Sequence, residues 1–115
     1  SMHSCGKERA LVEIAATETD LDCIDPLEIA PMGDTDIREV KEKFGKKIAL
    51  KGNLHTTNVM LFMDAKGVEQ EAIKLLEIGK PGGGFILSTG DQCGRDTPDE
   101  NIFKLVEVCE KYGKY

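Results

Sequence analysis

Short apolar segments alternate with amphipathic helical patterns along this chain of 115 residues. The segments at 22–25, 48–52 and 85–87 are too short for helices, and their apolar residues are consecutive rather than alternating. Consecutive apolar residues in strands are typical of a parallel sheet covered by helices. The repeated order of strand, loop and helix therefore predicts an α/β fold of consecutive βα units, in a single domain over residues 1–115. Ser1 is expected to derive from a cloning tag, and Met2 from the same tag or from the native start of the protein. The fold prediction uses neither residue.

The predicted helices are recognised from apolar residues at helical spacing and from residues that begin or end helices. They lie at 7–18, at 36–44, over a region around 68–76 that ends at Gly79, and after Thr97. In the first helix, Leu11, Ile14 and Ala15 share one face. Gly79 is a common type of helix terminator, and the proline two residues later cannot continue the helix.

The last helix has the clearest start. Thr97 is placed as the N-cap, Pro98 as the first-turn proline and Glu100 as the acid of a capping box. The helical spacing predicts a core face made of four residues, Ile102, Leu105, Val106 and Cys109.

Polar residues gather after the predicted strands. Asp25 and Glu28 follow the first strand, Asn53 and His55 the second, and Asp91 and Cys93 the third, while His3 and Cys5 precede the first helix. In parallel βα architectures the ligand binds at the carboxyl ends of the strands, so this placement predicts a binding site there. Simpler interpretations stay open, because Asp25 before a proline also shapes a turn and His55 also suits a solvated loop.

His3 and Cys5 are separated by one residue. On a strand, residues i and i+2 point to the same face, so the imidazole and the thiol can converge on one ion. With Cys93 as the third partner, they predict a zinc site with three protein ligands and one open position for a substrate. Such a site indicates chemistry on a sulfur nucleophile.

The charge balance excludes some classes of partner. Asp and Glu number 21 against 15 Lys and Arg, and the net charge of -6 argues against a nucleic-acid partner. No apolar run approaches the roughly 20 residues of a membrane span, and no secretory leader is seen, so we expect a soluble cytoplasmic protein with no membrane partner. Cys23 and Cys109 lie in apolar patterns and are predicted to be buried, reduced thiols.

Five stretches in this order resemble the C-terminal part of the uroporphyrinogen decarboxylase superfamily. They are His3-Ser4-Cys5-Gly6, Asp25-Pro26-Leu27-Glu28, Leu50-Lys51-Gly52-Asn53, Gly83-Gly84-Phe85-Ile86-Leu87-Ser88 and Thr97-Pro98-Asp99-Glu100-Asn101. The resemblance implies an eightfold βα barrel, of which this chain is about the last half, because a complete barrel takes roughly 250 residues.

The zinc-dependent branch resembles this sequence best. Its members move a methyl group from methylcobalamin, held by a partner corrinoid protein, to a thiol such as coenzyme M. The resemblance implies His3, Cys5 and Cys93 as zinc ligands. It implies Glu28 as the acid that fills the fourth position until the thiol arrives, and we assign Glu28 as catalytic. Two further residues, Asn53 and Asp91, are expected to bind cofactor.

Other functions remain open. The chain could be part of a cofactor-free decarboxylase, although that branch uses a His near the last strand and Thr89-Gly90-Asp91 offers none. Tetrahydrofolate could be the methyl acceptor instead of a thiol. A non-catalytic zinc-binding half-barrel is the third alternative. A half-barrel leaves strand edges unpaired and apolar side chains exposed, so we expect a homo-oligomer or association with an amino-terminal half.

Overall fold

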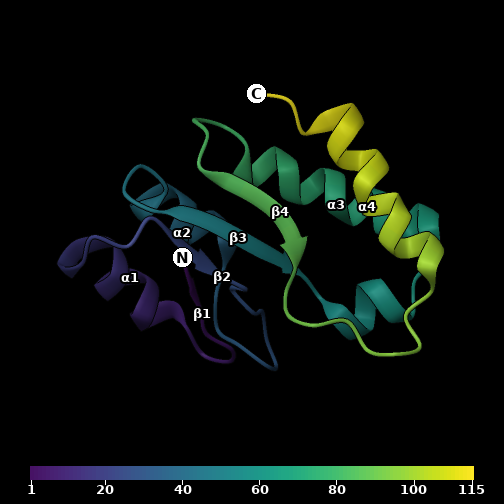
Figure 1. Ribbon diagram of the computed structural model, residues 1–115, viewed down its shortest axis with the longest axis horizontal. Helices are drawn as coiled ribbons and strands as arrows, with labels where there is room; N and C mark the ends of the chain where they lie inside the picture. Colours follow the sequence, from purple (N-terminus) through teal and green to yellow (C-terminus); the bar gives the residue numbers. More distant parts are fainter.

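The computed structural model describes residues 1–115 and contains one sheet of four parallel strands (Figure 1). The strands lie in the order of the sequence: β1 (Met2–His3), β2 (Cys23–Asp25), β3 (Ala49–Leu54) and β4 (Phe85–Thr89). All three neighbouring pairs are parallel. The α/β fold of consecutive βα units is confirmed, and four such units amount to half of a (β/α)8 barrel.

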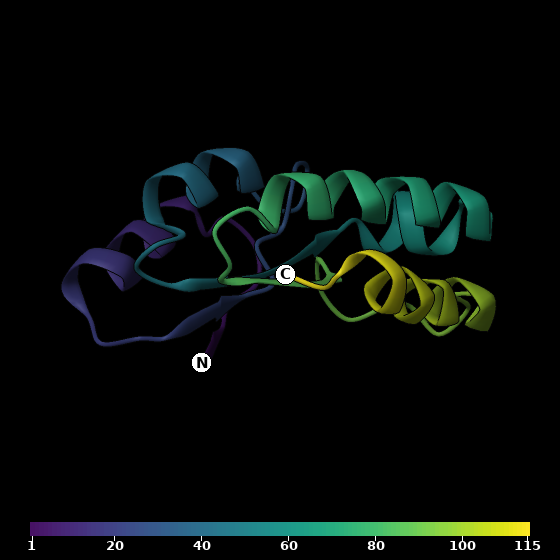
Figure 2. The ribbon, with the colours of Figure 1, turned by 90° about the horizontal axis from the view of Figure 1, so that it is seen from above.

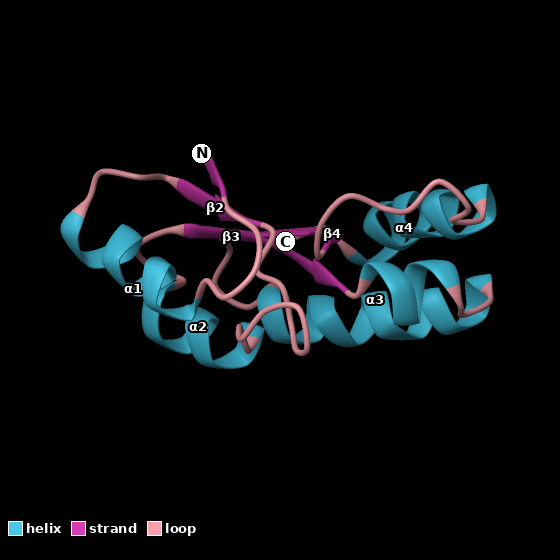
Figure 3. Cartoon of the chain, turned by 90° about the horizontal axis from the view of Figure 1, so that it is seen from below, coloured by secondary structure: helices cyan, strands magenta, loops and turns pink.

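A helix follows every strand. They are α1 (Arg9–Glu18), α2 (Ile37–Phe44), α3 (Ala65–Gly79) and α4 (Asp99–Tyr112), and a short π-helix, η1 (Thr56–Leu61), precedes α3. Figures 2 and 3 show α1, α2 and α3 on one side of the sheet, with α4 beside α3. No helix covers the other face of the sheet, which in a closed barrel would line the interior. None of the helices combines the length and hydrophobicity that a membrane span requires.

The core lies between the sheet and the helices on its covered side. Ile24, Leu50 and Phe85 contribute from three strands, and Val12, Val40 and Val68 from α1, α2 and α3. Burying each of these side chains stabilises the fold by about 1.5–3 kcal/mol. Because Ile24 pairs with Leu50 and Leu50 with Phe85, the same register that builds the core aligns the carboxyl ends of β2, β3 and β4.

Most predicted boundaries agree with the structure to within a few residues, but some assignments of faces are wrong. Met2, which the sequence argument sets aside, forms β1 and pairs with Ile24. Ile14, predicted to face the core, is 47% exposed, and Val12 is buried instead. Cys109, predicted to be buried, is exposed, whereas Cys23 is half-buried.

The predicted core face of α4 is wrong for three of its four residues, because only Leu105 packs against the core. Ile102 is 39% exposed and Val106 is 53% exposed, while the buried residues are Asn101 and Val108. The physical reason is that α4 packs on α3 and η1 along one side only. Asn101 makes this contact, because its Nδ2 donates hydrogen bonds to the carbonyl oxygens of Met60 and Met63, each at 2.9 Å.

The predicted start of α4 is also corrected. The helix begins at Asp99, and Pro98 occupies the N-cap position without any side-chain hydrogen bond. The hydroxyl of Thr97 is buried and has no hydrogen-bond partner. Asp99 and Glu100 lie in the first turn, where their negative charge interacts favourably with the helix dipole.

Candidate metal centre

The ends of the strands bring the amino terminus of the chain against the loop that follows β4. His3 is the last residue of β1 and pairs with Asp25, the last residue of β2. Cys5 lies two residues beyond β1, and Asp91 lies two residues beyond β4. The binding site predicted at the carboxyl ends of the strands therefore corresponds to a real convergence of polar side chains.

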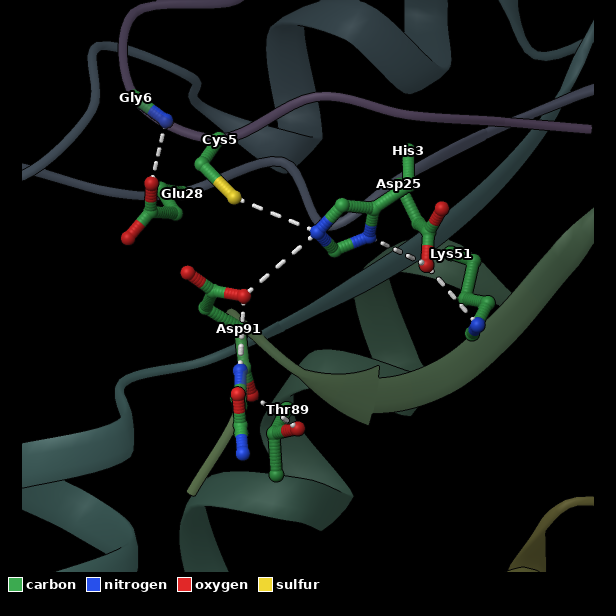
Figure 4. Close-up of polar contacts among 9 residues, drawn as sticks. His3, Cys5, Gly6, Asp25, Glu28, Lys51, Thr89 and Asp91 are labelled. Carbon is green, nitrogen blue, oxygen red and sulfur yellow. Dashed lines mark hydrogen bonds and ion pairs between the residues drawn. The ribbon is translucent and has the colours of Figure 1, made fainter. Parts of the chain in front are cut away.

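His3, Cys5 and Asp91 form one cluster, shown in Figure 4. The Nε2 atom of His3 lies 3.2 Å from the Sγ of Cys5 and 3.7 Å from Oδ1 of Asp91. One ligand atom from each of the three residues lies within 4.8 Å of the others. Imidazole nitrogen, thiolate sulfur and carboxylate oxygen are the atoms that bind zinc in proteins, so this donor set fits the ion.

The electrostatics of Cys5 favour a cation. The hydrogen bond to Asp91 raises the pKa of the Cys5 thiol, and partial desolvation and the charges of Asp91, Glu28 and Glu8 raise it further. Without a cation, the thiol therefore keeps its proton at neutral pH. A divalent ion would offset the negative charge around the sulfur and make the thiolate its ligand, with release of the proton.

Cys93, the predicted third ligand, does not lie in this cluster. Its side chain is half-buried and packs against the hydrophobic core. Asp91 lies there instead, because a turn after β4 fixes its backbone and side chain. Thr89 donates a hydrogen bond from Oγ1 to the carbonyl oxygen of Asp91 at 2.7 Å, and Oδ1 of Asp91 accepts the N–H of Gln92 at 2.8 Å.

Glu28 lies beside the cluster rather than within it. Only 8% of the residue is exposed, and its carboxylate accepts the backbone N–H of Gly6, the residue that follows Cys5 (Figure 4). Glu28 also lines a small pocket together with Asn53 and His55. The structure thus places the predicted catalytic acid in contact with Gly6, the residue next to the candidate ligand Cys5.

Asn53 has a structural contact that explains its burial. It is 5% exposed, and its Nδ2 donates a hydrogen bond to the carbonyl oxygen of Leu27 at 2.8 Å. This bond ties the end of β3 to the loop that carries Glu28. Asn53 therefore helps to hold the loop that carries Glu28, and it lines the same pocket as Glu28.

His55 is not a freely solvated loop histidine. Its Nδ1 accepts the backbone N–H groups of Thr57 and Asn58, each at 3.1 Å, and so caps the start of η1. Because Nδ1 accepts two hydrogen bonds, the ring proton of the neutral imidazole is on Nε2. That nitrogen is buried and has no hydrogen-bond partner.

Lys51 is a site residue that sequence reasoning missed. Its Nζ lies 2.9 Å from Oδ2 of Asp25, and the same oxygen lies 3.4 Å from Nδ1 of His3. Burial acts to raise the pKa of Asp25, but the contacts with Lys51 and His3 outweigh burial, so the pKa of Asp25 is lowered. In turn, the carboxylate of Asp25 raises the pKa of Lys51. The signal available in the sequence was a lysine within the predicted strand 48–52, whose other residues are apolar or glycine.

The comparisons with known proteins agree with this fold. The profile of the family described as Uroporphyrinogen decarboxylase (URO-D) matches residues 1–112. A uroporphyrinogen decarboxylase of Hamiltonella defensa is 31% identical over 70% of this chain and 22% of its own length. Another, of Pseudoalteromonas atlantica, is 34% identical over 67% of this chain and 21% of its own length. This chain thus aligns with about a fifth of the length of these curated relatives.

A solved structure shares the whole architecture. A methyltransferase from Methanosarcina mazei superposes with a TM-score of 0.74 over 97% of this chain and 31% of its own, at 23% sequence identity. At this identity the likeness establishes the fold. The partial barrel and the match to the profile along nearly the whole chain lead to the same conclusion: this chain belongs to the uroporphyrinogen decarboxylase family.

Proposed function

We propose that the chain is part of a zinc-dependent methyltransferase that moves a methyl group from a methylated corrinoid protein to a thiol such as coenzyme M. The observation that carries the proposal is the cluster of His3, Cys5 and Asp91 at the carboxyl ends of the strands. A cluster with one imidazole and one thiol is suited to zinc and to sulfur chemistry. The methyltransferase from Methanosarcina mazei shares the fold.

Each residue of the site has a proposed role. His3 and Cys5 hold the zinc, and the loop after β4 supplies the third ligand, which is Cys93 in the motif and Asp91 in the observed cluster. Bound zinc lowers the pKa of a substrate thiol and keeps the resulting thiolate nucleophilic. Glu28, whose carboxylate accepts the N–H of Gly6 next to Cys5, is the acid that we assign to the fourth position before the thiol binds.

The charges of the proposed ligands favour transfer to sulfur. Two anionic ligands, Cys5 with either Cys93 or Asp91, balance the 2+ charge of the ion. With zinc held by these ligands, a substrate sulfur would keep much of its negative charge and would stay reactive toward the methyl carbon. The methyl donor, methylcobalamin, is supplied by the corrinoid partner and enters here only as substrate.

Decarboxylation of a tetrapyrrole is the second candidate. It is favoured by the curated relatives, which are uroporphyrinogen decarboxylases with 31% and 34% identity to this chain. In that case the chemistry needs no metal and the cysteines have no role in the reaction. Tetrahydrofolate as the acceptor and a non-catalytic zinc-binding half-barrel are further alternatives, and both keep the zinc.

Metal analysis separates the zinc-dependent candidates from the decarboxylase. We expect about one zinc per chain after purification under reducing conditions, and loss of that zinc in Cys5→Ser. Cys109→Ser is the matched control, because Cys109 is exposed on α4 and belongs to no metal-ligating cluster, and it should retain the zinc. A folded protein that takes up no zinc, even after reduction and zinc addition, would favour the decarboxylase.

A further inference from the structure

Three charged or ionisable side chains form a row across the uncovered face of the sheet. His3 ends β1, Asp25 ends β2 and Lys51 lies in β3. His3 pairs with Asp25 in the register, and one step before it along β2, Ile24 pairs with Leu50, the neighbour of Lys51. The parallel register therefore sets these three side chains next to one another, as Figure 4 shows.

The row ends on the nitrogen of His3 that faces away from the candidate ligands. Oδ2 of Asp25 lies 2.9 Å from Nζ of Lys51 and 3.4 Å from Nδ1 of His3. An ionised carboxylate only accepts hydrogen bonds, so a proton on Nδ1 makes this contact favourable. Asp91 competes for the proton at the other ring nitrogen, but its Oδ1 is farther away, 3.7 Å from Nε2, so the nearer carboxylate of Asp25 favours Nδ1–H. The lone pair of the neutral ring is then on Nε2, which faces Cys5 and Asp91.

We infer that Asp25 is a positioning residue for the candidate zinc site. It holds His3 in the Nδ1–H tautomer and in one ring orientation, so that Nε2 is presented to the metal, and Lys51 holds Asp25 in place. Only 13% of the Asp25 side chain is exposed, which limits competition from water for this carboxylate. Histidine ligands of metals commonly donate their second N–H to such a carboxylate.

The role of Asp25 has two consequences that can be measured separately, the tautomer of His3 and the affinity of the chain for zinc. The tautomer of His3 is a property of the metal-free chain, whereas the effect on zinc affinity rests on the proposed function. A surface ion pair alone would be worth at most about 1 kcal/mol and would leave both the tautomer and the metal affinity unchanged when removed. These two readouts therefore distinguish positioning from a simple structural contact.

The first test is NMR of the metal-free chain labelled with ¹⁵N-histidine, at about pH 8.5, where imidazoles are ordinarily neutral. The chain has two histidines, and the structure gives them opposite tautomers. We expect Nδ1–H for His3 and Nε2–H for His55, whose Nδ1 accepts two backbone N–H groups. Asp25→Ala should shift His3 toward Nε2–H and leave His55 unchanged.

The second test is zinc affinity, measured by competition with a chromophoric chelator. Asp25→Ala should weaken binding by roughly 10- to 100-fold, and Asp25→Glu, which restores a carboxylate, should recover part of the loss. Glu71→Ala is the matched control, because it removes a carboxylate paired with Lys74 on α3, and it should bind zinc like the unchanged chain. Circular dichroism confirms that each variant is folded, and Asp25→Asn replaces the Ala variant if that one unfolds.

The outcomes separate the inference from the proposed function. His3 in the Nε2–H tautomer in the unchanged chain, or a His3 tautomer that does not respond to Asp25→Ala, overturns the positioning role. Zinc binding that is unaffected by the variant overturns its consequence for the metal but leaves the proposed function standing. If the unchanged chain binds no zinc, the proposed function fails, and the tautomer measurement still decides whether Asp25 orients His3.

Discussion

At the scale of single residues, the loop after β4 determines which side chain completes the metal site. Asp91 faces His3 in the structure, whereas Cys93 packs against the hydrophobic core. Both residues lie in one short loop between Gly90 and Gly94, and the added Cβ at Gly94 would meet no neighbouring atom. An exchange of Asp91 for Cys93 would require a change in the conformation of this loop, because Cys93 would have to leave its contact with the core.

We predict that Cys93→Ala removes most of the zinc affinity, because two thiolates bind the ion more strongly than a thiolate and a carboxylate. Metal content and chelator competition on the purified variant measure this. Asp91→Ala is the informative companion, since it removes the residue found in the cluster. Unchanged stoichiometry in Cys93→Ala, together with loss of zinc in Asp91→Ala, would make Asp91 the third ligand.

Glu8 is a second residue with a measurable consequence. It is 1% exposed, and neither carboxylate oxygen has a hydrogen-bond partner. Burial raises the pKa of Glu8 from 4.5 to about 7. The nearby backbone groups of Leu27 and Glu28 act to lower it, and the charges of Glu28 and Asp25 act to raise it. The folded chain therefore holds a proton that the unfolded chain releases at lower pH, and this contribution to stability is present below pH 4.5 and lost as the pH rises to about 7.

We expect Glu8→Gln to raise the free energy of unfolding above pH 7 by about 1–3 kcal/mol and to change it little near pH 4. Chemical denaturation of both chains between pH 4 and 8 measures the difference between them. Other carboxylates titrate in the same range, so the comparison with the unchanged chain isolates Glu8. A difference that does not depend on pH would show that Glu8 is not the group that titrates.

At the scale of helices and strands, the sequence predicted the three helices that pack on the sheet better than the fourth. In α2, Ile37, Val40 and Phe44 repeat at helical spacing and are all buried, because the surface they cover belongs to this chain. In α4 the apolar residues Ile102 and Val106 repeat equally well, but they are exposed. The pattern indicates a face that needs burial, not which surface buries it.

The candidate site shows the same limit: contacts that are local in the sequence were predictable, and those that depend on tertiary structure were not. The pairing of His3 with Cys5 was predictable because only one residue separates them along the chain, although Cys5 lies beyond the end of β1. The meeting of His3 with Asp91 depends on the turn after β4, and the row from His3 to Lys51 depends on the register of three strands. Neither can be read from the spacing of residues along the chain.

One buried polar residue of α4, Asn101, helps to attach this helix to the rest of the fold. Asn101 is fully buried, and its Nδ2 donates to two carbonyl oxygens near the end of η1. We predict that Asn101→Ala lowers the free energy of unfolding by about 1–3 kcal/mol, because both carbonyl groups lose their side-chain donor. Glu110→Ala, an exposed position on the same helix, should change it by no more than about 0.5 kcal/mol. Equal losses in the two variants would contradict this role of Asn101.

At the scale of the whole molecule, the chain leaves much of its surface incomplete. β1 and β4 are both edge strands, and one face of the sheet carries no helix (Figure 2). Besides Ile102 and Val106, α4 exposes 65% of Phe103. Unpaired parallel edges and apolar helix faces are features that proteins ordinarily cover by association. The curated relatives, of which this chain matches about a fifth, have further chain to cover them.

We therefore expect the isolated chain to associate, either with a second copy or with an amino-terminal half of the barrel. Light scattering coupled to size exclusion should give a mass above the 12.6 kDa of one chain, increasing with concentration. Val106→Glu places a charge on the exposed apolar face of α4 and should shift the equilibrium toward the monomer, while Lys47→Glu, an exposed position between α2 and β3, should not. A monodisperse monomer at every concentration would mean that these surfaces are tolerated in water, and association would then have to come from a separate chain that supplies the missing strands.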